Sequence, residues 1–242
     1  MLESLVKNNL EGWDILVGLE CSNVIREQIT LLEEYIPQAE VFKRDWPNVG
    51  NGKAIGRNGH DIVTRAFDSG SEYNIYLEED VVVSPDVTNL ADWYYEQEED
   101  TMCLCLHNIG TSYQDLQNSN AAIIYPNKEC TAAGGGNGFS AYGICMKKDK
   151  FFEHMSPYWF HRSGWDWGVW HHIEETKQKV LIPYQTRSDH IGVHGVHVAG
   201  PRHLRRLRQG YLEVYQGVVD TDSFYLSKEF RPCDFDPRKR DD

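Results

Sequence analysis

The 242-residue sequence has no apolar run as long as the roughly 20 residues that a membrane helix requires. Its first residues, MLESLVKNNLEGWD, contain neither the basic region nor the long apolar core of a signal peptide. The first absence argues against a helical membrane protein, and the second argues against secretion by a signal peptide. We therefore expect a cytoplasmic protein with no membrane span.

Positive charge is also scarce. The sequence has 24 Lys and Arg against 37 Asp and Glu, for a net charge of -13. Because nucleic-acid affinity depends mainly on Lys and Arg that neutralise phosphates, an extended polyanion is disfavoured as a partner. Nucleic acid stays open only through a local basic strip, from Arg202 to Arg208, and through PRKR near the C-terminus.

The six cysteines include no CxxC pair, which removes the most recognisable spacing of zinc and redox sites. Cys103 and Cys105 alternate within an apolar run that is typical of a strand. Buried, reduced thiols are the favoured interpretation, with disulfides or zinc as the alternatives.

What the sequence does contain is a composition typical of a folded protein, 40% hydrophobic and 25% charged. Apolar runs and helical periodicity alternate along its first third. They predict strands at 14–19, 39–43 and 73–77, with helices at 24–36 and 55–70 between them. This alternation is the signature of βαβ units, so we expect a single α/β domain built on a mostly parallel sheet.

The later segments continue the pattern less regularly. We expect helices at 87–100, 149–155, 165–175 and 201–210, extended segments at 101–108, 139–146, 179–184 and 188–200, and a polar loop at 110–120. A glycine-rich turn at 134–138 precedes the strand at 139–146. The last dozen residues have little apolar content, and we predict no regular structure there.

Three adjacent acids, Glu78, Glu79 and Asp80, follow the strand at 73–77 in YLEEDVVVSPD. In an open parallel sheet, ligands bind beyond the carboxyl ends of the strands. A divalent cation would hold such carboxylates ionised, and hard oxygen ligands select Mg²⁺ or Mn²⁺, which commonly also bind substrate phosphates. The alternative is a solvated acidic turn.

The stretch LEEDVVVSPD resembles the metal motif of GT-A fold, nucleotide-sugar-dependent glycosyltransferases. In particular it is similar to the E-D-D segment of the N-acetylglucosaminyltransferases that act on N-glycans. TMCLCLHNIG resembles the strand with W-N-D-N-G in that family, GNGF its glycine loop, and GWDWGVW its W-D-D-W, all in the family's order. The resemblance extends from Tyr73 to about Gly200.

The resemblance implies a GT-A (Rossmann-like) α/β fold with a mostly parallel central sheet flanked by helices. The glycosyltransferase domain would occupy residues 1–210, with a nucleotide-binding half to about 85, an acceptor-binding half at about 86–210, and a C-terminal appendage at 211–242. Asp80 would bind Mn²⁺ or Mg²⁺, together with Glu78, while Glu79 would contact the nucleotide-sugar. Small anchorless enzymes of this kind occur in bacteria and phages.

The resemblance makes Asp166 of GWDWGVW the catalytic base, with Trp165 and Trp167 stacking on the acceptor sugar. This chain has W-D-W where the relatives have W-D-D-W, and a helix N-cap is the alternative role for Asp166. Gly136 and Gly138 would let the backbone approach the donor sugar closely, since a Cβ would block that approach. Phe139 would contact the acceptor. A purely structural turn is the alternative.

Glu20 and Ser22 would lie near the nucleotide, and Arg57 near the diphosphate or against the acids, unless Arg57 is merely solvated. The resemblance also implies a metal-binding histidine, His190 or His197, with His194 between them. Zinc bound by the three would need a helix, which Gly192 and Gly195 oppose. The basic strip that follows would close over the diphosphate or an anionic acceptor, or be solvated.

Together these features predict an inverting glycosyltransferase that moves a sugar from a nucleotide-sugar, expected to be a UDP-sugar, to a hydroxyl acceptor. The acceptor could be a glycan, a protein or a modified DNA base. A nucleotidyltransferase is one alternative, although the first strand is not followed by a glycine-rich, lysine-bearing loop. The other is a non-catalytic carbohydrate-binding protein that uses the seven tryptophans and thirteen tyrosines as stacking surfaces.

Overall fold

The computed structural model describes residues 1–20, 22, 24–44, 53–97, 100–107, 121–124, 139, 141–161, 164–183, 185–190, 216–217 and 226–230. Helices and helical turns are α1 (Leu2–Leu5), α2 (Ile25–Tyr35), α3 (Lys53–Asp68), α4 (Val87–Gln97), α5 (Lys148–Lys150), the π-helical turn η2 (Phe151–Met155), the 3-10 turn η3 (Ser156–Tyr158) and α6 (Trp165–Thr176). Strands are β1 (Leu16–Leu19), β2 (Glu40–Lys43), β3 (Tyr73–Tyr76), β4 (Val81–Val83), β5 (Cys103–Cys105), β6 (Ala121–Ile124), β7 (Ile144–Lys147), β8 (Val180–Pro183), β9 (Ser188–His190) and β10 (Leu226–Phe230). The α/β class expected from the sequence is confirmed.

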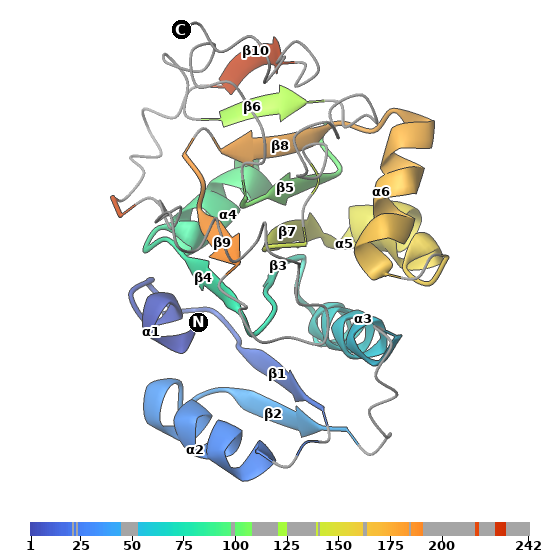
Figure 1. Cartoon of the computed structure of the whole chain (residues 1–242). Helices are drawn as coiled ribbons and strands as arrows, with labels where there is room; N and C mark the ends of the chain where they lie inside the picture. The colour runs from blue at the N-terminus through green and yellow to red at the C-terminus, as the bar shows by residue number, and fades with distance from the viewer. Residues whose placement is uncertain are drawn as a thin grey trace, which may run out of the picture.

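The strands form three sheets (Figure 1). The largest has the order β10-β6-β8-β5-β7-β3, while β1 pairs with β2 and β4 pairs with β9. In the largest sheet, β10–β6 and β5–β8 are parallel, but β6–β8, β5–β7 and β3–β7 are antiparallel.

The expectation of a mostly parallel central sheet is therefore wrong for the described residues. The first βαβ unit does form as expected, because α2 returns the chain so that β1 and β2 run parallel. The next strand, β3, does not extend that sheet and pairs instead with β7, which enters antiparallel from the second half of the chain. A βα alternation predicts the direction of consecutive strands but not which distant strand pairs with them.

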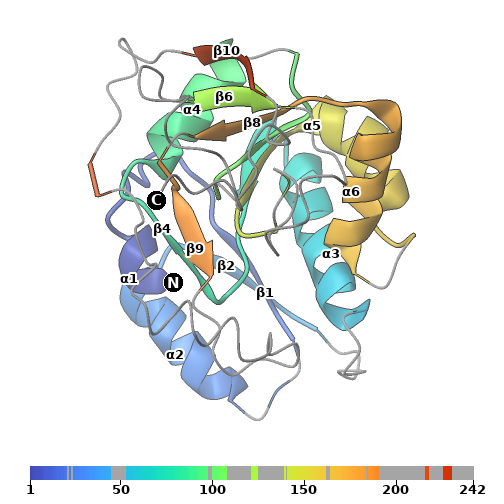
Figure 2. The same cartoon turned by 45° about the horizontal axis from the view of Figure 1, so that its top comes forward.

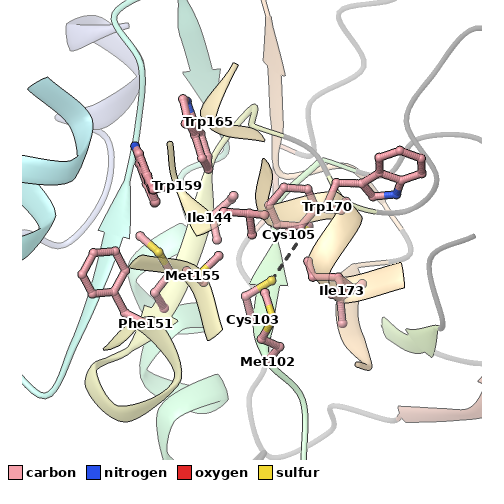
Figure 3. Close-up of a cluster of buried hydrophobic side chains, with 14 of the residues drawn as sticks. Met102, Cys103, Cys105, Ile144, Phe151, Met155, Trp159, Trp165, Trp170 and Ile173 are labelled. Carbon is pink, nitrogen blue, oxygen red and sulfur yellow. Dashed lines mark hydrogen bonds between the residues drawn. The ribbon is translucent and has the colours of Figure 1, made fainter. Parts of the chain in front are cut away.

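The six-stranded sheet buries a different set of side chains on each face. Strand alternation sends Cys103, Cys105 and Ile144 to one face, with α3, η2, Trp159 and α6, and sends Leu104 and Cys145 to the other, with α4 and β4. Figure 3 shows the first of these clusters. The period-two alternation is what a strand buried on both sides requires.

A third, smaller core joins β1 and β2 to α2. Helix α3 lies between this unit and β3 (Figure 1). Its Asn58 donates from Nδ2 to the carbonyl oxygen of Gly18 over 2.8 Å, and a Cβ at Gly18 would overlap Asn58 and Ile62. This close approach brings the carboxyl end of β1 towards the end of β3, where the acidic turn lies.

Most of the predicted helices and strands are present, with ends shifted by a few residues. The sequence did not predict α1, β4, β6 or β10 as separate elements. Strand β10 joins the edge of the six-stranded sheet, so part of the expected appendage at 211–242 belongs to the main fold. The predicted loop at 110–120, the glycine-rich turn and the basic helix at 201–210 lie outside the described residues.

Cys103, Cys105 and Cys145 are buried free thiols, as expected. The sulfur atoms of Cys103 and Cys105 lie 3.8 Å apart in the core (Figure 3). Within the described part of the chain, no helix combines the length and apolar character needed to cross a bilayer.

Candidate functional site

Acidic side chains gather around the end of β3. Glu78 and Asp80 lie in the turn that joins β3 to β4, closed by a hydrogen bond from Val81 N to Glu78 O of 3.2 Å. The pKa of Tyr76, the last residue of β3, is raised well above its ordinary value, first by burial and then by nearby carboxylates, among them those of Glu20 and Asp166. The structure therefore brings together acids from the end of β1, where Glu20 follows the strand, from the β3–β4 turn and from α6.

Glu78 is the most enclosed of these acids. Its Oε1 accepts a hydrogen bond from Nε1 of Trp165 over 3.2 Å. Burial raises the pKa of Glu78 to about 7, the Trp165 bond opposes that rise, and the negative charges of Asp80, Glu79 and Asp166 add to it. A cation placed here would favour the ionised form, since it would offset both burial and repulsion.

Trp165 itself is held in the core. Its ring stacks on Trp159 with centroids 4.3 Å apart and planes 12° from parallel (Figure 3). Trp159 in turn donates from Nε1 to the carbonyl oxygen of Gly56 in α3 over 2.8 Å. With 5% of its surface exposed and one face covered, Trp165 braces Glu78 and does not offer an open face for stacking on a sugar.

Phe139 and Trp167, the other two predicted acceptor contacts, differ in exposure. Phe139 is 5% exposed and lies edge-on to Trp165, with centroids 6.4 Å apart. Trp167, in the first turn of α6, is 53% exposed and open to a ligand. An acceptor contact stays a prediction for both, and the packing favours Trp167.

Asp166, next to Trp165, lies in the first turn of α6. The N-cap of this helix is Gly164, without a side-chain cap, so the alternative role of Asp166 as N-cap is wrong. A Cβ at Gly164 would lie 2.6 Å from Oδ1 of Asp166, which shows that the carboxylate folds back over the start of the helix. A carboxylate is stabilised at this end by the helix dipole, and it is half-buried beside the acidic turn.

Asp80 and His190 form a direct pair. Strand β9 lies beside β4 (Figure 2) and pairs with it antiparallel, with Val81 opposite His190. This register brings Nε2 of His190 to 2.8 Å from Oδ2 of Asp80. The hydrogen bond to Asp80 raises the pKa of His190, and burial partly opposes the rise. The other carboxylate oxygen of Asp80, Oδ1, is enclosed and has no hydrogen-bond partner among the described residues.

Asp80 offers one enclosed oxygen that suits a hard divalent cation. No group of three His, Cys, Asp or Glu side chains suited to a metal occurs within the described ranges. Mg²⁺ commonly needs only one or two carboxylates, because waters and substrate phosphates complete its shell. The enclosed Oδ1 of Asp80 is an oxygen donor of the kind that Mn²⁺ and Mg²⁺ prefer, whereas the imidazole of His190 is a nitrogen donor less suited to these cations. His194 and His197 lie outside the described residues.

The remaining predicted residues lie at the margin of the site or beyond the described ranges. Burial, then the charge of Glu79, raises the pKa of Glu20, which places Glu20 beside the acids. Ser22 donates to Oε1 of Gln28 over 3.3 Å, and Arg57 is exposed on α3. Gly136 and Gly138 lie outside the described residues, so their roles stay predictions.

Sequence reasoning missed Tyr142 and His107. The Tyr142 ring stacks on the ring of His190, with centroids 4.8 Å apart and planes 30° from parallel. His107 packs edge-on against Tyr142 at 5.2 Å. His107 stands within TMCLCLHNIG, so its place at a strand end was a usable signal, whereas nothing in the sequence around Tyr142 indicated its contact.

No protein-family model matches the chain, and no curated protein sequence matches it.

Proposed function

We propose that this protein is an inverting glycosyltransferase of the GT-A type that transfers a sugar from a nucleotide-sugar, a UDP-sugar in the first instance, to a hydroxyl acceptor. The observation that carries the proposal is the gathering of Asp80, His190 and Asp166 around the carboxyl end of β3. Two observations support the proposal: the charge of Asp166 contributes to the raised pKa of Glu78, and Nε2 of His190 lies 2.8 Å from Oδ2 of Asp80.

Each residue has a role that its position supports. Asp80 and His190 would hold Mn²⁺ or Mg²⁺ and Glu78 would support them, while Glu20 and Glu79, which lie near each other, would contact the nucleotide. When bound, the cation supplies Lewis-acid stabilisation of the diphosphate charge. Nearby carboxylates without a cation would instead repel a diphosphate, which makes metal dependence part of the proposal.

The reaction needs one proton acceptor from the protein. The acceptor oxygen forms a bond to the anomeric carbon as the bond from that carbon to the diphosphate oxygen breaks, and the nucleoside diphosphate leaves with the electron pair. Asp166 takes the proton of the acceptor hydroxyl. The configuration inverts because a single displacement occurs, with no covalent intermediate on the protein.

Trp167 favours a sugar-bearing acceptor, since an exposed indole beside the base offers a flat apolar face to a pyranose ring. The same exposure supports the second candidate, a carbohydrate-binding protein without activity. A nucleotidyltransferase would use the same acidic turn. Glycan, protein and modified DNA base all stay open as acceptors.

A screen for Mn²⁺-dependent hydrolysis and thermal shift with a panel of nucleotide-sugars tests the proposal. We expect a shift and slow hydrolysis with one donor, both lost in Asp80→Asn and kept in Glu33→Gln, a matched control on the exposed face of α2. Glycan binding without donor binding would favour the lectin, and release of pyrophosphate from a nucleoside triphosphate would favour the nucleotidyltransferase. Either result contradicts the proposed function.

A further inference from the structure

Two residues outside the acidic turn contact His190 or its strand. Tyr142 stacks on the imidazole of His190, and His107 contacts Ser188 in β9. We propose that they are positioning residues, which hold the imidazole of His190 in the direction of Asp80 so that a divalent cation can bind. This inference rests on the proposed function and extends it to side chains that no motif indicated.

Tyr142 acts on the ring of His190 directly. It lies immediately before β7, and its ring covers one face of the imidazole at 4.8 Å and 30°. The hydroxyl of Ser188, in the same strand as His190, donates to the carbonyl oxygen of Tyr142. The backbone of Tyr142 therefore holds β9 while its side chain limits rotation of the His190 ring.

His107 also holds this strand, at the same residue, Ser188. Its Nδ1 lies 2.6 Å from the carbonyl oxygen of Ser188, and because a carbonyl oxygen can only accept, Nδ1 is the protonated nitrogen. The hydroxyl of Thr186 lies 3.2 Å from the same nitrogen. At 7% exposure, His107 is a buried polar anchor between the end of β5 and the start of β9.

These contacts matter because a metal-binding imidazole must be oriented by groups other than the metal. Such outer partners typically change metal affinity by about 10–100-fold when they are removed. Without a cation, the hydrogen bond from Nε2 to Asp80 orients His190. A cation would bind to Nε2 and replace that hydrogen bond. The stack on Tyr142 does not use Nε2, so it can orient the ring in both situations.

The test measures Mn²⁺ affinity by electron paramagnetic resonance, with and without UDP, in matched pairs of variants of the full chain. Tyr142→Leu removes the stack, and Tyr142→Phe keeps it. His107→Leu removes the donor to Ser188, and His107→Asn keeps an N–H near the position of Nδ1. We expect Mn²⁺ to bind about tenfold more weakly to Tyr142→Leu and His107→Leu. We expect Mn²⁺ affinity within about twofold of wild type for Tyr142→Phe and His107→Asn.

Thermal unfolding in EDTA separates positioning from general stability, because Tyr142→Leu must weaken Mn²⁺ binding in protein that is still folded at the assay temperature. Excess Mn²⁺ should restore hydrolysis of the nucleotide-sugar in that variant, which a misfolded site would not allow. Equal Mn²⁺ affinity in wild type and Tyr142→Leu overturns the inference and leaves the proposed function intact. If wild type binds no Mn²⁺ even with UDP, the proposed function fails and the inference fails with it.

Discussion

Nε1 of Trp165 donates to Oε1 of Glu78 over 3.2 Å, and this bond joins the first residue of α6 to the turn after β3. Asp166, the proposed base, follows Trp165 directly in the chain. The stack of Trp165 on Trp159, and the bond from Trp159 to Gly56, extend the connection to α3. A shift of the acidic turn would therefore be passed to the helix that bears the base.

Trp165→Phe should reveal how much this bond contributes. The phenyl ring keeps most of the stack on Trp159 but removes the donor, which leaves a buried carboxyl oxygen without its partner. We expect a loss of about 1–3 kcal/mol in the free energy of unfolding at pH 8, measured by urea denaturation. Trp167→Phe, at an exposed position of the same helix, should change stability by less than about 0.5 kcal/mol. Equal losses in the two variants would contradict the bracing role.

The raised pKa of Glu78 predicts a definite pH dependence of stability without metal. The unfolded side chain loses its proton near 4.5, and the folded one near 7. Between these values the folded protein binds more protons than the unfolded chain, so stability falls as pH rises through this window and then levels off. Across this window the free energy of unfolding falls by at most about 3 kcal/mol.

Glu78→Gln removes this titration while keeping an oxygen that can accept from Trp165. We expect the variant to be more stable than wild type at pH 8 in EDTA, and the difference to disappear near pH 4. The raised pKa of His190 also lowers the free energy of unfolding as pH rises, from above 6.5 through the pKa of the folded protein. Parallel stability curves for wild type and Glu78→Gln would contradict a buried, protonated Glu78.

The sequence indicated the acidic turn, Asp166 and His190 as candidates because each lies in a short motif that resembles the glycosyltransferase family, and their roles stay predictions. It did not predict that β3 pairs with β7, since hydrophobic periodicity is a property of each segment and strand pairing depends on contacts far apart in sequence. Strand β6, AAII, is too short for a periodic signal. The bracing role of Trp165 was missed for a similar reason, because a tryptophan beside a predicted base reads equally well as a sugar platform or as core.

Two glycines that contact the same region predict opposite responses to a methyl group. In α6, a Cβ at Gly168 would overlap the carbonyl oxygen of Tyr158, a backbone atom that cannot rotate away. In α3, a Cβ at Gly56 would meet its nearest atom, Cβ of Trp165, at 3.8 Å, which is ordinary contact.

Gly168→Ala should therefore destabilise the protein by about 1–3 kcal/mol through overpacking between α6 and η3. Gly56→Ala should be neutral or stabilise it by up to about 1 kcal/mol, because alanine is the better helix former. Urea denaturation of both variants checks the pair. A tolerated Gly168→Ala would mean that α6 packs less closely on η3 than the structure shows.

The buried ion pair of Asp86 and Arg187 predicts the largest effect outside the acidic turn. Nε of Arg187 lies 3.2 Å from both carboxylate oxygens of Asp86, and the two side chains are 4% and 0% exposed. Arg187 immediately precedes β9, and its carbonyl oxygen accepts from Ser84 N over 2.8 Å, so the pair helps to hold the strand that bears His190.

Arg187→Met should cost about 3–5 kcal/mol, because it leaves the Asp86 carboxylate buried without its cation. The double variant Asp86→Asn/Arg187→Met should recover part of that loss, since the uncompensated charge is gone. Urea denaturation of the single and double variants measures the recovery. A double variant no more stable than Arg187→Met would show that packing of the arginine side chain, not its charge, stabilises this region.

If β9 depends on the pair as the contacts indicate, Mn²⁺ affinity should fall in Arg187→Met and return towards the wild-type value in the double variant, in parallel with stability.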